Sequence, residues 1–582
     1  MQAPSTSYRR LLQTYLAPQR AHLAILATLL LIDLALQLSL PRVVQIFIDS
    51  ATGQADLRTL LWIGVVYLAV ALGQNWTLVG WQYLAQNIGL IATNRIRADL
   101  TSHCLQLSMG FHNSRTPGEL IERVDGDVSK LHNFLSQFMV QVLLNGLLLT
   151  GVVGLLFLLD WRVGLPSIVS VVVAMLCAGV LIRPMATYSV KERQASAELF
   201  GLLEERLSGT EDIRANGAVG YVLRRHIERS RTLFRAGVIR ALLGMISWRS
   251  LNTAIEIGAI VSLAIGALLA LDGVLTIGQV YLIVAYTTML NRPVEELMRQ
   301  LDDLQQAVAS MGRVQQLFAT QPQIVDAQQG ALLPDEPLSV ELDDVSFAYP
   351  DDDLVLREVS LRIPAGTTLG VVGRTGSGKT TLTRLLLRLY DPTAGVVRLG
   401  GVDLRDVPNA NLRTRVAIVT QDIHLFSATV RDNLTFFDPA IADAQVWAAL
   451  DMLGMGDWVR AQPNGLDTPL ASGGTGLSAG EAQLLAFTRA FLRDPGLIIL
   501  DEASSRLDPA TERRLDQALT QLLRGRTAII IAHRLGTLER VDQILILEDG
   551  QVQESGRRAD LVGDPDSRFA QLLRVGMEDA LA

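Results

Sequence analysis

The chain lacks most features of a secreted or nucleic-acid-binding protein. It has only two cysteines, Cys104 and Cys177, without metal-like spacing, so no disulfide framework is expected and a thiol-reducing cytosolic face fits. No basic tract stands out, and the formal net charge of −8 argues against a general nucleic-acid binder. Aromatic residues make up only 5% of the chain, and no array of charges marks a ligand site.

Long apolar runs, by contrast, fill the first half of the chain, and the mean hydropathy is +0.29. The N-terminus is polar, with Arg9, Arg10 and Arg20, and the apolar stretch that follows is too long for a signal-peptide core, so we expect a first membrane span. A span needs about 20 apolar residues to cross ~30 Å of hydrocarbon. The predicted spans are 22–47, 58–83, 135–158, 163–182, 246–270 and 274–290.

The connections between these stretches alternate in length and charge. Those at 84–134 and 183–245 are long and arginine-rich, whereas only Arg58 and Arg162 lie in or beside the short ones. The positive-inside rule places both termini and both long segments in the cytoplasm of an integral, multi-pass protein, expected in a bacterial inner or plasma membrane. The apolar spacing in 190–207 indicates that the spans continue as cytosolic helices, although two small soluble insertions would also fit.

A few polar residues interrupt the predicted spans: Asp33, Asn75, Asn145 and Glu256. Charges in hydrocarbon are costly, so such residues tend to face a water-filled cavity or a partner. A substrate pathway and structural pairing between helices both remain open at this point.

The second half, 335–582, has the pattern of a soluble α/β protein. Between a predicted strand and a predicted helix, the sequence matches the phosphate loop G-x-x-x-x-G-K-[ST] at every fixed position. Its glycines let backbone N–H groups approach phosphates, Lys379 would reach the β- and γ-phosphates, and the Thr380 hydroxyl would bind Mg²⁺. The expected nucleotide-binding residues in this region are Gly373, Arg374, Thr375, Gly376, Ser377, Gly378, Lys379, Thr380 and Thr381.

A second apolar strand, 497–500, ends in Asp501 and Glu502. Such a strand places its terminal acids beside the phosphate loop of the same sheet. Asp501 would hold Mg²⁺ through water, and Glu502 would polarise the attacking water as general base. The pair alone is a weak signal, which the upstream phosphate loop strengthens. ATP and Mg²⁺ are therefore the expected cofactors.

With these motifs the chain resembles ATP-binding cassette (ABC) transporters of the exporter-type half-transporter class, over nearly its whole length. The resemblance rests on the order phosphate loop, Gln421, signature loop, Asp501-Glu502, Ser505–Asp508 and His533. It implies that Tyr349 stacks on adenine, that Gln421 contacts Mg²⁺ and the attacking water, and that His533 is the switch histidine on the γ-phosphate. The expected catalytic residues are thus Glu502, His533 and Gln421, and the expected Mg²⁺ ligands are Thr380, Gln421 and Asp501.

The signature loop departs from the family pattern. The usual sequence is LSGGQ, and here the residues are Leu477, Ser478, Ala479, Gly480 and Glu481. In the family this loop acts on ATP held by the partner subunit. The Glu481 carboxylate would weaken closure around that triphosphate, at both sites of a homodimer. We therefore expect a heterodimer in which this chain supplies Glu502, although a homodimer that tolerates the change would also fit.

Two segments of the membrane half add to the resemblance. Residues 111–128 resemble the first cytoplasmic loop of exporters, which carries a coupling helix onto the cassette, and 209–218 lie where the second belongs. The expected fold is a multidomain membrane protein. It has an all-α six-helix transmembrane domain at 1–320 with long cytoplasmic helix extensions, a linker at 321–337, and an α/β P-loop NTPase ABC cassette at 338–582.

The resemblance implies ATP-hydrolysis-driven transport by a dimer in a lipid bilayer, as export or as translocation of a lipid or hydrophobic compound. A siderophore-type importer and a membrane-anchored regulatory ATPase are the alternatives, because topology alone does not fix direction. The substrate is left open among small molecules, lipids and peptides. No nucleic acid is expected as a partner.

Overall fold

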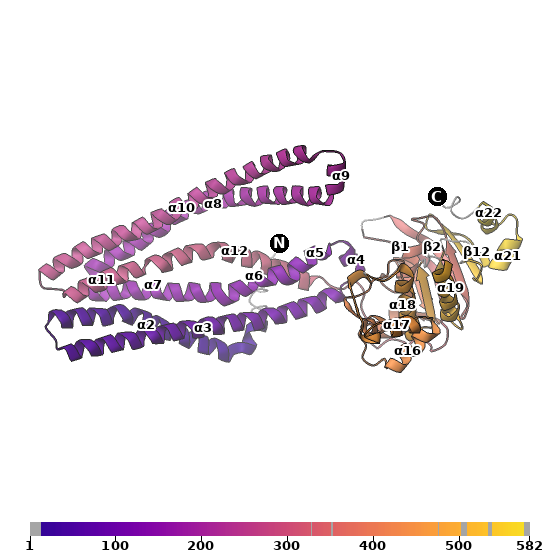
Figure 1. Cartoon of the computed structure of the whole chain (residues 1–582), viewed down its shortest axis with the longest axis horizontal. Helices are drawn as coiled ribbons and strands as arrows, with labels where there is room; N and C mark the ends of the chain where they lie inside the picture. Colours follow the sequence, from indigo (N-terminus) through magenta and orange to yellow (C-terminus); the bar gives the residue numbers. More distant parts are fainter. Residues whose placement is uncertain are drawn as a thin grey trace. The chain divides into compact units, whose positions relative to one another are not determined.

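The structure, a computed structural model, describes residues 13–327, 329–350, 353–474, 476–501, 509–532 and 538–575. Contacts between residues divide the chain into two compact units (Figure 1). One consists of Met1–Leu105 and Pro117–Thr320, and the other of Gln106–Thr116 and Gln321–Ala582. The short segment Gln106–Thr116 therefore belongs to the second unit by its contacts, although it lies within the range 1–320 in the sequence.

The first unit is built from long helices. Among the described residues, five helical stretches are long and apolar enough to cross a membrane: Gln13–Thr52, Leu57–Gln106, Pro117–Leu159, Trp161–Leu181 and Val219–Leu271. They overlap, in that order, helices α2 (Arg20–Thr52), α3 (Leu57–Gln106), α7 (Met139–Leu159), α8 (Trp161–Ser208) and α10 (Val219–Leu271). Each overlaps one of the first five predicted spans, and in the third span residues 135–138 belong to the π-helical turn that precedes α7.

The sixth predicted span, 274–290, is only partly helical. Helix α11 (Ile277–Met289) begins later, where Thr276 and Gln279 form a capping box. Its 13 residues span about 20 Å, less than the hydrocarbon thickness. The helix is interrupted at Leu290 before α12 (Asn291–Ala319). Pro293 lacks an N–H and its ring crowds the carbonyl of Met289, which explains the break. The segment therefore needs the first turns of α12 to reach the length of a span.

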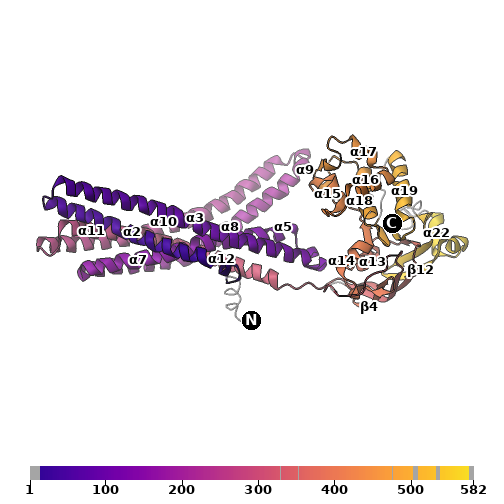
Figure 2. The same cartoon turned by 90° about the horizontal axis from the view of Figure 1, so that it is seen from below.

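Helices α8 and α10 run side by side as a long hairpin with α9 (Thr210–Ala215) at its tip (Figures 1 and 2). Small residues allow the close approach: Ser167 Oγ lies 3.3 Å from Ser262 Oγ, and a Cβ on Gly258 would lie 2.3 Å from Ser170 Cβ. The long segment 183–245 is thus helical on both sides of α9, which confirms that the helices extend well beyond the predicted spans; their cytosolic location stays a prediction.

Shorter helical pieces connect α3 to α7. They are α4 (Met109–Asn113), α5 (Pro117–Ile121), the π-helical η2 (Glu122–Asp127), α6 (Val128–Asn133) and the π-helical η3 (Phe134–Phe138). The predicted loop 84–134 is therefore largely helical as well.

The second unit contains two main sheets. The four-stranded sheet has the order β2-β1-β4-β5 and the six-stranded sheet the order β12-β11-β3-β10-β9-β6. The strands are β1 (Val340–Ala348), β2 (Leu354–Ile363), β3 (Thr368–Val372), β4 (Ala394–Leu399), β5 (Val402–Asp403), β6 (Val416–Val419), β9 (Leu497–Asp501), β10 (Thr527–Ile531), β11 (Gln543–Glu548) and β12 (Gln551–Arg557). In the larger sheet all neighbouring pairs are parallel except β11 with β12.

This sheet is covered on both faces, on one by helices that include α18 and α19 and on the other by α13 with the four-stranded sheet, so its central strands are apolar on both sides. All five residues of β3 and of β10 are buried. Successive residues alternate between two cores: Ile498 and Ile530 belong to one, and Ile499 and Ile529 to the other.

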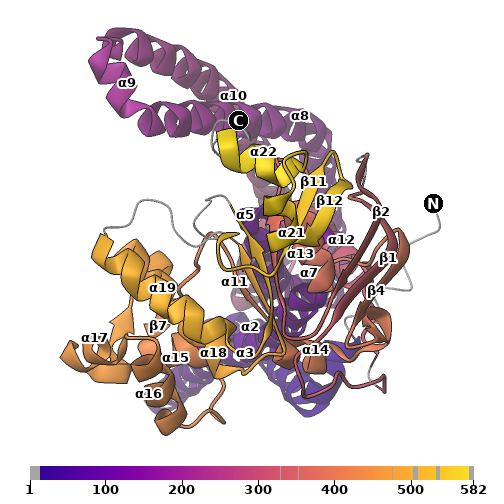
Figure 3. The same cartoon turned by 90° about the vertical axis from the view of Figure 1, so that its right-hand side faces the viewer.

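The helices of this unit include α13 (Lys379–Leu386), α14 (Asn409–Arg415), α15 (Val430–Thr435), α16 (Asp443–Met452), α17 (Gly456–Ala461), α18 (Ala479–Leu492), α19 (Pro509–Leu523), α21 (Arg558–Gly563) and α22 (Arg568–Val575). Figure 3 shows α15, α16 and α17 gathered to one side of the sheets.

Candidate functional site

Strand pairing brings the predicted phosphate loop and Asp501 to the same edge of the six-stranded sheet. Ile531 of β10 lies opposite Val371 of β3 and also opposite Asp501 of β9. Because the three strands are parallel, the loop that follows β3 leaves the sheet where β9 delivers Asp501. Asp501 is partly buried there. A buried parallel sheet that carries a glycine-rich loop and an acid at one edge can hold a phosphate and its cation.

The loop from Gly373 to Gly378 depends on glycine. Gly378 has φ +101° and is the N-cap of α13, a conformation that other residues rarely adopt. A Cβ on Gly373 would lie 2.3 Å from the carbonyl oxygen of Leu547. The loop can therefore follow this path only with glycine at both positions.

Lys379 and Ser377 form the polar lining of this loop. Lys379 is buried, and its Nζ donates to the carbonyl oxygens of Gly373 (2.6 Å) and Arg374 (2.8 Å). Ser377 Oγ is buried and has no hydrogen-bond partner among the described residues. The loop thus offers a cation and an unsatisfied buried hydroxyl at the start of a helix. These groups would bind an anionic group such as a phosphate.

Tyr349 lies beside the first turns of α13. Its hydroxyl is 3.1 Å from Thr381 Oγ1 and accepts a hydrogen bond from Arg384 Nη1 at 2.9 Å. Phe347 and Tyr390 contact its ring edge-to-face, with centroids 4.9 and 5.2 Å away. These contacts hold the ring close to the phosphate loop; adenine stacking on it stays a prediction.

The other predicted catalytic residues are only partly within the described chain. Gln421 is exposed and follows β6, whose Val419 pairs with Leu500 of β9. It therefore lies two residues beyond the sheet edge that carries Asp501. Glu502, His533 and the segment Ser505–Asp508 lie outside the described residues.

The signature loop caps its own helix. Ser478 is the N-cap of α18, and its Oγ accepts a hydrogen bond from the Glu481 amide at 3.2 Å. In return, one carboxylate oxygen of Glu481 accepts from both the backbone N–H and the hydroxyl of Ser478, each at 2.8 Å. Leu477 packs against the adjacent core, Ala479 is exposed and Gly480 is buried. The carboxylate therefore already occupies two donors at this helix start.

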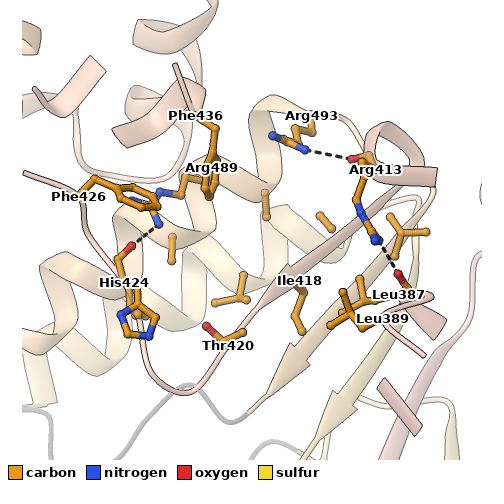
Figure 4. Close-up of a pocket in the computed structure, with 16 residues that line it drawn as sticks. Leu387, Leu389, Arg413, Ile418, Thr420, His424, Phe426, Phe436, Arg489 and Arg493 are labelled. Carbon is orange, nitrogen blue, oxygen red and sulfur yellow. Dashed lines mark hydrogen bonds between the residues drawn. The ribbon is translucent and has the colours of Figure 1, made fainter. Parts of the chain in front are cut away.

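A pocket of about 380 Å³ lies between β6 and α18 (Figure 4). Its lining includes Phe426, Phe436 and three arginines, Arg413, Arg489 and Arg493, and no acidic side chain among the described residues that line it. Such a pocket would accept an acidic or aromatic group. Arg489 and Arg493 are four residues apart at the end of α18, whereas Arg413 lies on α14, 76 residues before Arg489, so the sequence alone does not show that the three meet.

Arg489 is the best-anchored cation of this pocket. It donates to the Asn433 carbonyl (2.6 Å), the Asn433 side-chain oxygen (2.8 Å) and the His424 carbonyl (2.9 Å). Burial lowers its pKa to about 10. Its guanidinium also lies 4.9 Å from the centroid of the Phe436 ring. The partners of the Arg489 guanidinium are neutral carbonyl groups and an aromatic ring. They therefore stabilise its positive charge without cancelling it.

Helix α4 is held to the rest of the second unit by hydrogen bonds in and beside it. Asn113 Nδ2 donates to the Tyr390 hydroxyl at 3.0 Å, and Ser108 Oγ donates to Gln323 Oε1 at 3.3 Å. The start of the segment 111–128, predicted to carry a coupling helix, is therefore in contact with the unit that holds the phosphate loop. Through Tyr390 it is linked to Tyr349.

Two family models match the chain, the ABC transporter transmembrane region at residues 23–294 and the ABC transporter at residues 356–505. The ATP-dependent lipid A-core flippase of Syntrophus aciditrophicus (strain SB) is 30% identical over 566 residues, covering 95% of this chain and 92% of that protein. The putative multidrug export ATP-binding/permease protein YgaD of Bacillus subtilis (strain 168) is 29% identical and covers 85% of each.

A solved structure extends the likeness to the whole fold. The ATP-bound structure of a bacterial Atm1-family ABC exporter has a TM-score of 0.80 and 25% identity, covering 96% of this chain and 98% of that one.

Proposed function

The chain belongs to the ABC transporter family, and from that premise we propose that it is one half of a dimeric exporter that moves a lipid or other amphiphile across a membrane. The observation that supports this most is the union, in one chain, of long apolar helices with a lysine- and glycine-lined phosphate loop. The named functions of the flippase and multidrug relatives point the same way.

At the nucleotide site, we propose that the phosphates of ATP lie against the loop 373–380, with Lys379 as their principal cation. Thr380 and Asp501 would hold Mg²⁺, assisted by Gln421, and the ion when bound neutralises phosphate charge. Glu502 takes the proton of the attacking water, and His533 contacts the γ-phosphate. The unsatisfied Ser377 hydroxyl supports this arrangement because it offers the phosphates a further donor.

The cytosolic part of the α8–α10 hairpin supports assembly into a dimer. Large apolar side chains are exposed there, among them Phe200, Leu207, Tyr221 and Phe234, the last with 71% of its surface accessible. We place this segment outside the membrane, where lipid cannot cover it, so a protein surface is the natural cover. We assign that surface to the second subunit.

The geometry of Glu481 favours a heterodimer. In a closed dimer the Ser478 hydroxyl and the first amides of α18 would have to reach the partner's γ-phosphate. Here the hydroxyl and the Ser478 amide already bind the Glu481 carboxylate, and that carboxylate repels a triphosphate. A homodimer would carry this conflict at both sites, whereas a partner with a neutral signature residue would leave one site free of it.

Sealed vesicles made from a bacterial inner membrane test the proposal. With the cassette outside, added ATP is expected to drive accumulation of a fluorescent lipid or amphiphile, and Lys379→Ala is expected to abolish it. ATP hydrolysis without any movement of substrate would support a regulatory ATPase instead. Movement only in the opposite direction would indicate an importer.

A further inference from the structure

One face of α10 within the predicted span 246–270 is fully occupied by contacts with other helices. Leu251, Ile255 and Ser262 are buried there, and Gly258 meets Ser170 of α8. Ser262 Oγ also donates to the carbonyl oxygen of Val163 at 3.3 Å. This face is structural, and its spacing of three to four residues fixes the orientation of the whole helix.

The opposite face of the same helix carries charge. Arg249, Asn252 and Glu256 follow one another at helical spacing, and the side chains of Arg249 and Glu256 are 64% and 51% exposed. Arg249 Nη2 lies 3.8 Å from Glu256 Oε2, the longest of the described ion pairs. The two charges therefore neutralise each other only weakly.

This face changes character along the helix. Beyond Glu256 it continues with Ile260, 65% exposed, and with Leu263, also exposed. A charged end is thus followed, one turn later, by an apolar end. An amphiphile could therefore lie along this face with its polar head at the charged end and its hydrocarbon tail at the apolar end.

Of the other polar residues named in the predicted spans, Asp33 and Asn75 make hydrogen bonds within the structure, and Asn145 of α7 is half-buried. Asp33 is 3% exposed and accepts a hydrogen bond from Thr77 Oγ1 at 3.1 Å, so it joins α2 to α3. Asn75 donates to the Ala71 carbonyl of its own helix. Glu256 differs, because its carboxylate is exposed. Placing an ionised acid of a membrane helix against hydrocarbon costs about 2.5–3.5 kcal/mol of free energy. It therefore needs water or a ligand.

Two further groups that suit a cation lie at the Arg249 end of this stretch, about 12 Å along the helix from Glu256. Trp248 is half exposed at the cytosolic end of this stretch, and its indole ring can contact a cation with its face. Its Nε1 donates to Glu295 Oε1 of α12 at 2.7 Å, which adds a second carboxylate to the region. Arg249 lies seven residues before Glu256, about 10 Å closer to the cytosol.

We propose that this face of α10 is a substrate site for an amphiphile whose head group carries a positive charge. Glu256 contacts the cation, Arg249 contacts any anionic group that the head carries, and the tail lies along Ile260 and Leu263. The inference rests on the proposed transport function and narrows its substrate to cationic or zwitterionic amphiphiles.

The test compares two probes that differ only in charge: a fluorescent long-chain trimethylammonium amphiphile and its neutral tert-butyl analogue. Binding is measured to the full-length protein in nanodiscs of zwitterionic lipid, with empty nanodiscs subtracted. Glu256→Gln is expected to weaken binding of the ammonium probe about tenfold and to leave the neutral probe unchanged. The matched control is Glu228→Gln, an exposed acid on the cytosolic part of the same helix, which should change neither.

If Glu256→Gln weakens binding of both probes equally, or weakens binding of neither, the assignment of Glu256 is overturned. A change in the mass of the assembly caused by Glu256→Gln would also overturn it, because the residue would then be a subunit contact. Wild-type ATP hydrolysis and transport are measured alongside. If these persist while the charge effect is absent, only the substrate site is wrong; if the wild type neither hydrolyses ATP nor transports in inner-membrane vesicles that also contain its partner subunit, the proposed function itself fails.

Discussion

Asp127, at the end of η2, is the residue of the first unit whose replacement we expect to be most damaging. Its carboxylate is 1% exposed. It accepts hydrogen bonds from Ser310 Oγ at 2.9 Å and from Arg313 Nε at 2.8 Å, both on α12. The chain passes between its units at three points, after Leu105, Thr116 and Thr320, and the pair joins the two segments of the first unit that adjoin the last two of them.

The expected cost of Asp127→Asn follows from this geometry. Breaking a buried ion pair costs about 3–5 kcal/mol because one charge is left unpaired. Arg313 is 41% exposed, so water would still solvate its guanidinium, and an asparagine oxygen could still accept one of its hydrogen bonds. We therefore expect a loss of ~2–3 kcal/mol in the free energy of unfolding of the first unit.

The pair also makes this unit sensitive to acid. Burial opposes ionisation of Asp127, but the hydrogen bonds from Arg313 and Ser310 outweigh it and hold its pKa below the ordinary value of 3.8. A depressed pKa contributes stability above the carboxyl's pKa in the unfolded chain, and that stability is lost as the pH falls through the lowered pKa. The contribution is therefore complete at neutral pH.

Thermal unfolding in nanodiscs and limited proteolysis between the units provide the assay. Asp127→Asn should lower the midpoint and speed cleavage, whereas Glu198→Gln, which removes an exposed partner of Arg229, should change little. In a double-mutant cycle with Arg313→Gln, the second substitution should add little to the first. Full additivity, or an Asp127→Asn protein as stable as wild type, would refute the reasoning.

Three further outcomes are expected. Lys379→Ala should abolish ATP binding in an equilibrium nucleotide assay, because the phosphates lose their principal cation; unchanged affinity would argue against the loop. Glu481→Gln should raise ATP turnover of the chain purified alone, since it frees the Ser478 donors; an unchanged rate in a stable homodimer would argue against the asymmetric assembly. On a cysteine-free background, a cysteine at position 272 should react with an impermeant reagent from outside and one at 215 should not; the reverse pattern would invert the topology.

The sequence predicted best what depends on local pattern. The predicted phosphate loop and the strand before Asp501 could be located because β3 and β9 are continuous apolar runs. Such runs are typical of strands in a sheet that is buried on both faces. The first five spans followed from length and hydropathy alone. The sixth, 274–290, also followed from hydropathy; its helix begins only at Ile277, and Leu290 keeps a helical conformation between α11 and α12.

Features that depend on contacts between distant segments were not predictable. The arginine-lined pocket brings Arg413 and Arg489 together, although they are 76 residues apart in the sequence. The double role of the Glu481 carboxylate on Ser478 is a matter of side-chain geometry, and the sequence showed only that a charge is present. Likewise, Asp33 and Glu256 look equivalent in the sequence, and only burial separates a helix–helix contact from an exposed carboxylate.

The most direct test of the central claim is ATP turnover and transport in sealed vesicles by the wild type and by Glu502→Gln. The wild type should hydrolyse ATP and move an amphiphile. The variant should still bind ATP, remain as a closed dimer and lose turnover about 10²–10⁴-fold, because only the general base is removed. Wild-type turnover in the Glu502→Gln protein would contradict the proposed mechanism, and hydrolysis by the wild type without any transport would contradict the proposed function.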